Sequence, residues 1–350
     1  MFPATGHREF LLPAQSPISV AVVGVGVFGR NHARVYKELE QQGEPVRLLG
    51  VVDPDTSRAD EVAREFGCKA FGSVPQMLTT HSEVQVASVT CPTVHHLSVA
   101  SELMKDGVDV LIEKPLAGTL AEAEELVALA ARHKRIAQVG HLERFNPAVR
   151  ATVPLLTQPM FFEVHRLSVF TPRSLDVDVV LDLMIHDLDI VLAFAKSPIK
   201  EVRAVGLPIL SGKVDIANVR LEFESGCIAN FTASRVSTER VRKLRFFQPR
   251  QYVSLDYGRQ EVLVFTVGHD TATGTPSVNP QIGVMKPPVA SEEPLHAELK
   301  SFLRAVRERS TPVVPLEDGR RALALALEIV VAIREHGAKV GLAGIAKAKP

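Results

Sequence analysis

The stretch ISVAVVGVGVFG, residues 18–29, decides the fold of this chain. It begins with a continuous apolar run typical of a buried strand, and its glycines at 24, 26 and 29 have the spacing G-x-G-x-x-G. A helical pattern follows at residues 31–40. Gly24 permits a tight turn, Gly26 allows a pyrophosphate to approach the backbone, and Gly29 allows the helix to pack on the strand. The combination predicts a dinucleotide-binding site.

An acidic residue, Asp53, ends the next predicted strand at residues 47–53. A carboxylate there can accept hydrogen bonds from both hydroxyls of an adenosine ribose. It would also repel a 2′-phosphate, so NAD is favoured over NADP, although the nearby Arg58 weakens that preference. The N-terminus of the helix offers unpaired N–H groups to the phosphates. The cofactor contacts predicted from this motif are Gly24, Gly26, Val27, Phe28, Gly29, Asp53 and Arg58.

The order of strands and helices predicts two domains. Apolar strands alternate with helices up to residue 141, which predicts an α/β domain with a doubly wound parallel sheet, and strand patterns dominate afterwards, which predicts an α+β domain with an antiparallel sheet. The expected boundaries are an N-terminal extension at 1–17, an NAD-binding domain at 18–141, and a substrate-binding and oligomerisation domain at 142–350. In the second domain we expect helices at 147–156, 179–195, 293–308 and 316–336, and a surface loop at 269–283.

The composition narrows the class of partner. Lys plus Arg equals Asp plus Glu at 40 each, and no basic stripe is present, which argues against nucleic acid and favours a small-molecule substrate. No apolar run is long enough to cross a membrane. The cysteines, Cys68, Cys91 and Cys227, are few and far apart, so we expect neither disulfides nor a cysteine-based metal site, and we expect a cytoplasmic protein.

A second set of residues follows the strands of the predicted parallel sheet. The strand at 109–113 ends on Glu113, and Lys114 and a proline follow it, while Cys91 and Pro92 follow the preceding strand. In open parallel sheets, ligands bind beyond the carboxyl ends of the strands. We therefore expect these four residues beside the nicotinamide, where Lys114 could hydrogen-bond a substrate hydroxyl. The alternative for Lys114 is an ordinary solvated loop lysine.

The segment DLMIHDLDI, residues 182–190, places Asp182 and His186 four positions apart on one predicted helix. Histidine suits the removal of a proton from an alcohol because its pKa lies near neutral pH, and Asp182 could orient it. An ion-paired helix with an incidental histidine is the alternative reading. A zinc site that combines His186 with His95, His96 or His141 is disfavoured, since the chain has no HExxH motif and no cysteine pair.

Several motifs together resemble the glucose-fructose oxidoreductase/inositol dehydrogenase (Gfo/Idh/MocA) family. They are GVGVFGRNHAR, VVDPD, CPTVHH, MKDGVDVLIEKPLAGTLAEAEEL, DLMIHDLD and EEPLHAELKSFLRAV. The resemblance implies a Rossmann domain, a large open antiparallel sheet, and NAD(P)-dependent oxidation of sugars or cyclitols in dimers or tetramers. It matches Lys114, Asp182 and His186 to the catalytic residues of the family, and His96 to a histidine of its cofactor loop. Thr93 replaces the usual asparagine and Met184 the usual glycine.

A narrower resemblance lies in VGHLERFNPAV, HRLSVFTPRSLDVDVVLDLMIHD and KVDIANVRLEF. These segments are similar to members of the family that oxidise C3 of UDP-N-acetylglucosamine for amino-sugar synthesis in lipid A assembly. Arg144, Arg166 and Arg173 could then pair with the diphosphate through bidentate hydrogen bonds, or they could be ordinary surface arginines. Asn146 could contact the sugar or cap the helix predicted to begin at Pro147.

The leading hypothesis is therefore an NAD-dependent dehydrogenase in which His186 accepts the hydroxyl proton, Lys114 stabilises the oxygen, and Asp182 holds the histidine. The roles of Lys114 and His186 could be reversed. The alternatives are oxidation of a free sugar, an inositol or a glycoside, and a non-catalytic NAD-binding regulator. The exposed face of the antiparallel sheet predicts a homodimer or homotetramer.

Overall fold

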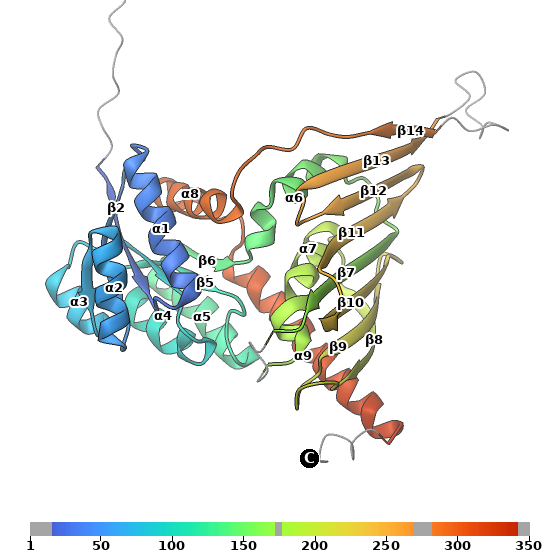
Figure 1. The fold of residues 1–350 in the computed structure, drawn as a ribbon, viewed down its shortest axis with the longest axis horizontal. Helices are drawn as coiled ribbons and strands as arrows, with labels where there is room; N and C mark the ends of the chain where they lie inside the picture. The colour runs from blue at the N-terminus through green and yellow to red at the C-terminus, as the bar shows by residue number, and fades with distance from the viewer. Residues whose placement is uncertain (1–15, 172–176, 269–281, 342–350) are drawn as a thin grey trace, which may run out of the picture.

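The computed structural model describes residues 16–171, 177–268 and 282–341 of the chain, which form two bodies (Figure 1). The first body contains a six-stranded parallel sheet in the order β3-β2-β1-β4-β5-β6. Its elements are β1 (Ile18–Val23), α1 (Val27–Gln41), β2 (Val46–Val52), α2 (Thr56–Phe66), β3 (Lys69–Phe71), α3 (Val74–Thr80), β4 (Val86–Val89), α4 (His96–Lys105), β5 (Asp109–Glu113), α5 (Leu120–His133) and β6 (Ala137–Gly140). The predicted doubly wound sheet is confirmed. The order reverses at β1, which makes the edge beyond β1 and β4 the expected ligand site.

The second body is an eight-stranded sheet in the order β14-β13-β12-β11-β7-β10-β9-β8. Its strands are β7 (Phe161–Val169), β8 (Ile199–Leu207), β9 (Ile216–Phe223), β10 (Ile228–Ser237), β11 (Val241–Gln248), β12 (Gln251–Asp256), β13 (Glu261–Val267) and β14 (Ile282–Met285). All neighbours are antiparallel except β7 and β10, which are parallel. The large open antiparallel sheet is thus confirmed with one parallel pair inside it.

Side chains alternate across this sheet, as a period of two requires. In β7, Phe162 and Val164 are buried, whereas Phe161 and Glu163 are partly exposed on the other face. Helices cover the buried face: α6 (Pro147–Thr152), α7 (Ile185–Ala195) and α9 (Leu316–Lys339), while the opposite face carries no helix in the described chain (Figure 1). None of the described helices combines the length and hydrophobicity needed to cross a bilayer.

Three local predictions are corrected. The helix expected at 179–195 is divided into a π-helical turn, Val180–Met184, and α7. The helix expected at 147–156 ends as α6 at Thr152 and continues only as a 3₁₀ turn. The loop expected at 269–283 falls mostly outside the described residues, and its last two positions belong to β14, which was not predicted.

The helix α8 (Pro294–Glu308) returns to the first body although its sequence follows the second sheet. Its residues Leu299 and Phe302 are fully buried in one cluster with Val20 of β1 and Tyr36 of α1. The helix α9 then packs against both bodies, since it contacts α5 and β6 on one side and α7 and β8 on the other. The chain after residue 142 therefore contributes to both cores, and α8 and α9 fix how the two bodies sit.

One acidic residue of α8 is buried in this arrangement. Glu298 is 0% exposed, and neither of its carboxylate oxygens has a hydrogen-bond partner among the described residues. Burial raises its pKa well above the ordinary value, and the charge of Glu113 raises it further. The folded protein therefore keeps Glu298 protonated to a higher pH than the unfolded chain, which ionises it above about pH 4.3.

This difference makes the stability depend on pH. Because the pKa is raised on folding, the contribution of Glu298 is fully present below the unfolded pKa and is lost as the pH rises towards the folded pKa, at about 1.4 kcal/mol per pH unit. We expect Glu298→Gln to raise the free energy of unfolding at pH 8, and to raise it much less at pH 5. Urea unfolding at both pH values measures this, and Glu308→Gln, at the exposed end of the same helix, is the control. An equal effect of Glu298→Gln at pH 5 and pH 8 would contradict it.

Candidate active site

The three glycines between β1 and α1 have different surroundings. Gly24 has φ of +89°, and a Cβ there would lie 2.5 Å from the Cα of Cys91. A Cβ at Gly29 would lie 1.9 Å from the carbonyl oxygen of Gly24. A Cβ at Gly26 would meet no atom within 4 Å. The first and third glycines are thus required by packing, and the second leaves open space beside the backbone, as a pyrophosphate needs.

The first turn of α1 completes this phosphate site. Its N-cap, Gly26, supplies no side-chain cap, and no acidic residue lies in the first turn, so the N–H groups there remain available to an anion. The apolar side chains Val27 and Phe28 are 71% and 37% exposed beside it. The residues present therefore fit a dinucleotide, which would cover both side chains.

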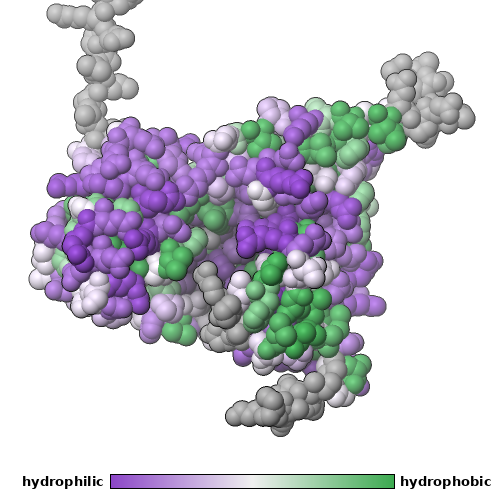
Figure 2. Space-filling view, viewed as in Figure 1, coloured by the Kyte–Doolittle hydropathy of each residue, from purple (hydrophilic) through white to green (hydrophobic). Residues whose placement is uncertain are grey.

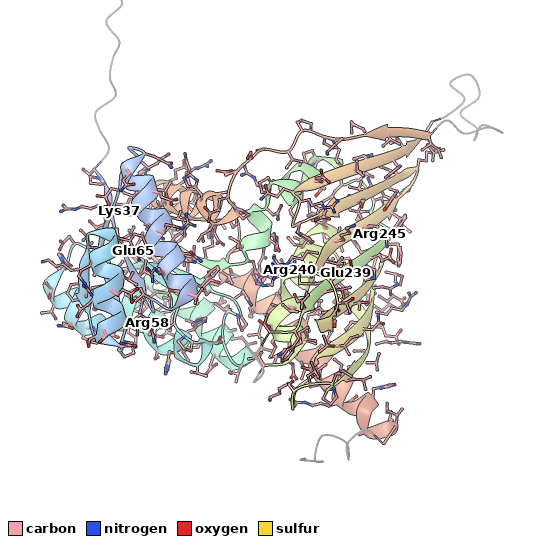
Figure 3. All side chains as sticks on the ribbon, in the orientation of Figure 1. Lys37, Arg58, Glu65, Glu239, Arg240 and Arg245 are labelled. Carbon is pink, nitrogen blue, oxygen red and sulfur yellow. The ribbon has the colours of Figure 1, made fainter. Side chains whose placement is uncertain are left out.

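Asp53 lies directly after β2, at the adenosine end of the site. Its Oδ2 accepts a hydrogen bond from the Val25 N–H at 2.9 Å, and its Oδ1 accepts one from the Asp55 N–H at 3.0 Å. The Nη1 of Arg58 lies 3.3 Å from each oxygen, and Figure 3 shows Arg58 at the edge of the first body. The carboxylate predicted to bind the ribose thus also fixes the glycine turn, and a cation lies beside it, as expected.

His96 is buried between the loops that follow β4 and β5. Its Nε2 lies 3.0 Å from the carbonyl oxygen of Cys91, and its Nδ1 lies 3.2 Å from that of Leu116. The ring is 1% exposed and joins these two loops, and its contact with the cofactor stays a prediction. Cys91 and Pro92 follow β4 at the carboxyl edge of the parallel sheet, as predicted. Burial raises the pKa of the Cys91 thiol to about 11, which keeps the thiol neutral.

Lys114 and Asp182 meet, although 68 residues separate them in the sequence. The strand β5 ends at Glu113, the Lys114–Pro115 peptide is cis, and the side chain of Lys114 extends toward the π-helical turn. Its Nζ donates a hydrogen bond to the carbonyl oxygen of Asp182 at 3.0 Å and lies 3.9 Å from the Oδ1. Burial lowers the pKa of Lys114, against the opposing charges of Asp182 and Glu113. Lys114 is therefore not a solvated loop lysine.

His186 lies in the first turn of α7, beside these residues. Burial lowers its pKa well below 6.5, and the cations Lys114 and Arg166 lower it further. Its Nδ1 is buried without a hydrogen-bond partner among the described residues. In that part of the chain no hydrogen bond joins Asp182 to His186, so the geometry favours Asp182 as the partner of Lys114. The imidazole is neutral at pH 7, as a base must be.

A chain of buried polar groups that was not predicted from the sequence lies behind Lys114. The Nε2 of His32 lies 3.2 Å from Glu113 Oε1, and its Nδ1 lies 3.1 Å from the hydroxyl of Ser88, which in turn lies 2.9 Å from the Tyr36 hydroxyl. Glu113 also accepts a hydrogen bond from the Lys114 N–H at 3.3 Å. The chain therefore fixes the backbone from which the lysine extends. The available signal was the buried stripe of α1, which contains His32 and Tyr36.

Two of the predicted diphosphate ligands are paired inside the protein. Arg144 donates to both oxygens of Asp189 at 2.6 and 2.9 Å and to Asp318 at 3.0 Å. Arg166 is 3% exposed and donates to Glu143 and Asp187. Two carboxylates thus already match each cation, which favours a role in holding α7 in place. Arg173 lies outside the described residues.

Asn146 is a helix cap. Its Oδ1 accepts a hydrogen bond from the Ala148 N–H at 3.0 Å, and its Nδ2 donates to Glu143 and to the carbonyl oxygen of Tyr257. The side chain is buried and fully used by these contacts. Of the two predicted roles, the cap is the one that the structure shows.

The histidines named for a zinc site have different surroundings in the described structure. His95 is exposed, the ring of His96 is used by two carbonyl oxygens, and His141 is buried with neither ring nitrogen hydrogen-bonded in the described structure. The described residues contain no group of three or more His, Cys, Asp or Glu side chains placed to hold a metal ion.

Two further side chains lie beside Arg166 on the helix-covered face of the sheet. Arg242 of β11 pairs in register with Arg166 of β7, and Tyr257 follows β12 in the next position of the same row. The sequence contained a signal for both arginines. Arg166 has the parity of Phe162 and Val164, and Arg242 has the parity of Leu244 and Phe246, so each cation falls at a core-facing position of its strand.

Known proteins resemble the chain along most of its length. The model described as "Oxidoreductase family, NAD-binding Rossmann fold" matches residues 18–141, and that of the GFO/IDH/MocA C-terminal domain matches residues 158–252. UDP-N-acetylglucosamine 3-dehydrogenase from Acidithiobacillus ferrooxidans is 37% identical over 313 residues, which cover 89% of this chain and 96% of that protein. The scyllo-inositol 2-dehydrogenase (NAD(+)) from Bacillus subtilis is 27% identical over 235 residues, which cover 63% of this chain and 68% of that protein.

Solved structures agree with this. A structure of the Acidithiobacillus ferrooxidans enzyme has a TM-score of 0.82 at 34% identity, and the match covers 91% of this chain and 98% of that one. Levoglucosan dehydrogenase in complex with NADH has a TM-score of 0.80 at 15% identity and shares the fold, with 91% and 98% of the two chains covered.

The open space at Gly26 leads to a prediction about cofactor binding. We expect Gly26→Val to weaken NAD binding at least tenfold, because the isopropyl group would occupy the phosphate space, and to leave the melting temperature nearly unchanged, because φ is −62° and no atom lies within 4 Å. Gly29→Ala should instead destabilise the fold. Titration of NAD by calorimetry and thermal melting of both variants measure this. A Gly26→Val protein that binds NAD like the wild type would contradict it.

Proposed function

Because the chain belongs to the Gfo/Idh/MocA family of NAD-binding oxidoreductases, we propose that it oxidises the C3 hydroxyl of UDP-N-acetylglucosamine to the 3-keto sugar nucleotide with NAD. The observation that carries the proposal is the hydrogen bond from Lys114, at the end of β5, to Asp182 of the second body, which lies one helical turn before His186. Binding of NAD alone does not require a buried lysine at the end of β5 and a neutral histidine in α7, so the presence of these residues favours an enzyme over a regulator.

The chemistry follows from the protonation states. Oxidation of a secondary alcohol removes a hydride from carbon and a proton from oxygen. When bound, NAD accepts the hydride. The neutral imidazole of His186 accepts the proton, and the ammonium of Lys114 donates a hydrogen bond to the substrate oxygen while negative charge develops on it. Asp182 keeps Lys114 in place and favours its charged form.

The choice of substrate rests on similarity. The relative named UDP-N-acetylglucosamine 3-dehydrogenase is more similar and more completely covered than the inositol dehydrogenase. The 3-keto product would then be available for amination, and we infer that the enzyme serves lipopolysaccharide amino-sugar synthesis. We also infer a cytoplasmic site of action, which the three unpaired cysteines support.

We further propose that the protein is a homodimer or homotetramer assembled through the face of the large sheet that no described helix covers. A row of aromatic side chains crosses this face: the ring centroids lie 5.6 Å apart for Phe161 and Phe247, 4.8 Å for Phe247 and Tyr252, and 5.1 Å for Tyr252 and Phe265. Figure 2 shows hydrophobic residues at the β13–β14 edge, where Val284 continues the row at 62% exposure. An apolar surface of this kind favours burial by a second copy.

The first test is turnover. Incubation with UDP-N-acetylglucosamine and NAD should produce NADH absorbance and a nucleotide sugar lighter by two hydrogens in the mass spectrum. His186→Asn should lower kcat by about 10²- to 10⁴-fold, the range expected for loss of a general base, and leave NAD affinity within about twofold. His133→Asn, at the end of α5, is the control. Wild-type turnover in the His186→Asn variant would exclude His186 from the mechanism.

The pH profile distinguishes the base. With His186 as the base, kcat/KM should fall only on acidification well below pH 6.5, because its pKa is lowered on burial and by nearby cations. With Lys114 as the base, the rate would instead rise through the alkaline range toward a pKa below 10.5. Stopped-flow rates from pH 5 to 10 separate the two.

The aromatic row is tested separately. We expect Phe247→Lys to convert the oligomer to a lower mass, because a cation in the centre of the row cannot be buried against a second copy without a partner. Light scattering after size exclusion gives the mass, and Thr80→Lys on the exposed end of α3 is the control. A monomeric wild type at micromolar concentration, or an unchanged mass in the variant, would overturn the proposed interface.

A further inference from the structure

Two arginines lie directly opposite each other on the helix-covered face of the sheet. Arg242 of β11 pairs in register with Arg166 of β7. Like charges at directly opposed positions of an antiparallel pair repel each other and destabilise the pair unless other groups compensate them. Carboxylates neutralise the charge of Arg166 but not that of Arg242, and this difference points to an anionic ligand at Arg242.

Arg166 is fully compensated. Its Nε and Nη2 donate to Asp187 at 2.6 and 3.0 Å, and its Nη1 and Nη2 each lie 3.1 Å from the Oε1 of Glu143. Burial alone would lower its pKa, and these two carboxylates more than offset that and raise it.

Arg242 has no such partner. The described residues offer no carboxylate within salt-bridge distance of its guanidinium, and its Nε is buried without a hydrogen bond. Burial lowers its pKa, and the adjacent cation Arg166 lowers it further. A partly buried, unpaired guanidinium is unfavourable in the free protein and becomes favourable once an anion pairs with it.

The position of Arg242 indicates which anion it would bind. Arg166 donates a hydrogen bond to Asp187, which directly follows His186 in the chain. Arg242 lies opposite Arg166 in the sheet, so only the Arg166 side chain separates it from the segment that carries His186. The cofactor pyrophosphate site at Gly26 belongs to the other body. Arg240, exposed in the β10–β11 connection, adds a second cation with no ion pair among the described residues, next to the acidic Glu239. Figure 3 shows Arg240 and Glu239 at the side of the sheet that faces the first body, where Figure 2 shows the surface hollowed.

We propose that Arg242, assisted by Arg240, binds the diphosphate of a nucleotide-sugar substrate and thereby places the sugar between Lys114 and His186. The inference rests on the proposed function, and it transfers the role expected of Arg144 and Arg166 to residues whose charge is not already matched. Guanidinium groups suit it because they bind phosphate oxygens in pairs.

The test variant is Arg242→Gln, with Arg203→Gln on the edge strand β8 as the matched control. Arg242→Gln should raise KM for UDP-N-acetylglucosamine about 10- to 100-fold, leave NAD affinity unchanged, and reduce calorimetric binding of inorganic pyrophosphate to the NAD-loaded protein to a similar extent. It should melt no lower than the wild type without ligand, because an unpaired cation has been removed. The control should behave like the wild type in all four measurements.

The outcomes separate the two proposals. If the wild type turns over UDP-N-acetylglucosamine and Arg242→Gln has the same KM, the diphosphate assignment is wrong and the proposed function stands. If the wild type shows no turnover, but pyrophosphate binds it and binds Arg242→Gln at least tenfold more weakly, the substrate is wrong and the anion site stands. If pyrophosphate binding is absent from the wild type or equal in both proteins, the anion site is overturned.

Discussion

The hydrogen bond from Lys114 Nζ to the carbonyl oxygen of Asp182 joins the two halves of the site. It is made by a lysine whose side chain is 21% exposed, so the ammonium has lost much of its water and depends on these protein oxygens. On the first body, Glu113 accepts a hydrogen bond from the Lys114 N–H and lies 3.2 Å from His32, the first member of a buried chain that ends at Tyr36. On the second body the hydrogen bond from Lys114 Nζ depends on the π-helical turn that presents the Asp182 carbonyl group.

The buried arginines likewise depend on protein oxygens in place of water. Burying a cation is tolerated where carboxylates surround it, and Arg144 and Arg166 satisfy that requirement with two carboxylates each. Both pairs end on α7, at Asp189 and Asp187. They therefore fix the helix that carries His186. A cation used in this way cannot also recruit a substrate phosphate without giving up its partner, which is why charge alone is a poor guide to a binding residue.

The sequence was most informative where local chemistry determines structure. The glycine turn, the end of β5 at Glu113 and the alternation of β7 are local patterns, and the structure follows them. The return of α8 to the first core and the pairing of β14 were not predictable in this way, because they depend on partners far away in the chain. The site was predicted as a set of residue types. The structure brings Lys114 and Asp182 together, and it shows backbone hydrogen-bond contacts of His96 and Asn146 that the sequence pattern did not specify.

The return of α8 to the first body also explains how residues from two bodies can keep a fixed geometry in one site. A single connection at residue 141 would leave the sheet able to move relative to the first body, and contacts at hydrogen-bond distance, such as that between Lys114 and Asp182, would not persist. The helix α8 adds a second attachment through Phe302 in the core beside β1, and α9 adds a third, where a Cβ at Gly319 would lie 2.5 Å from Val139 of β6. Because α9 also packs on α7 and β8, the same helix that touches the parallel sheet supports the helix bearing His186. The position of the lysine of one body relative to the histidine of the other is therefore set by packed cores, so the candidate site is held in place before any ligand binds.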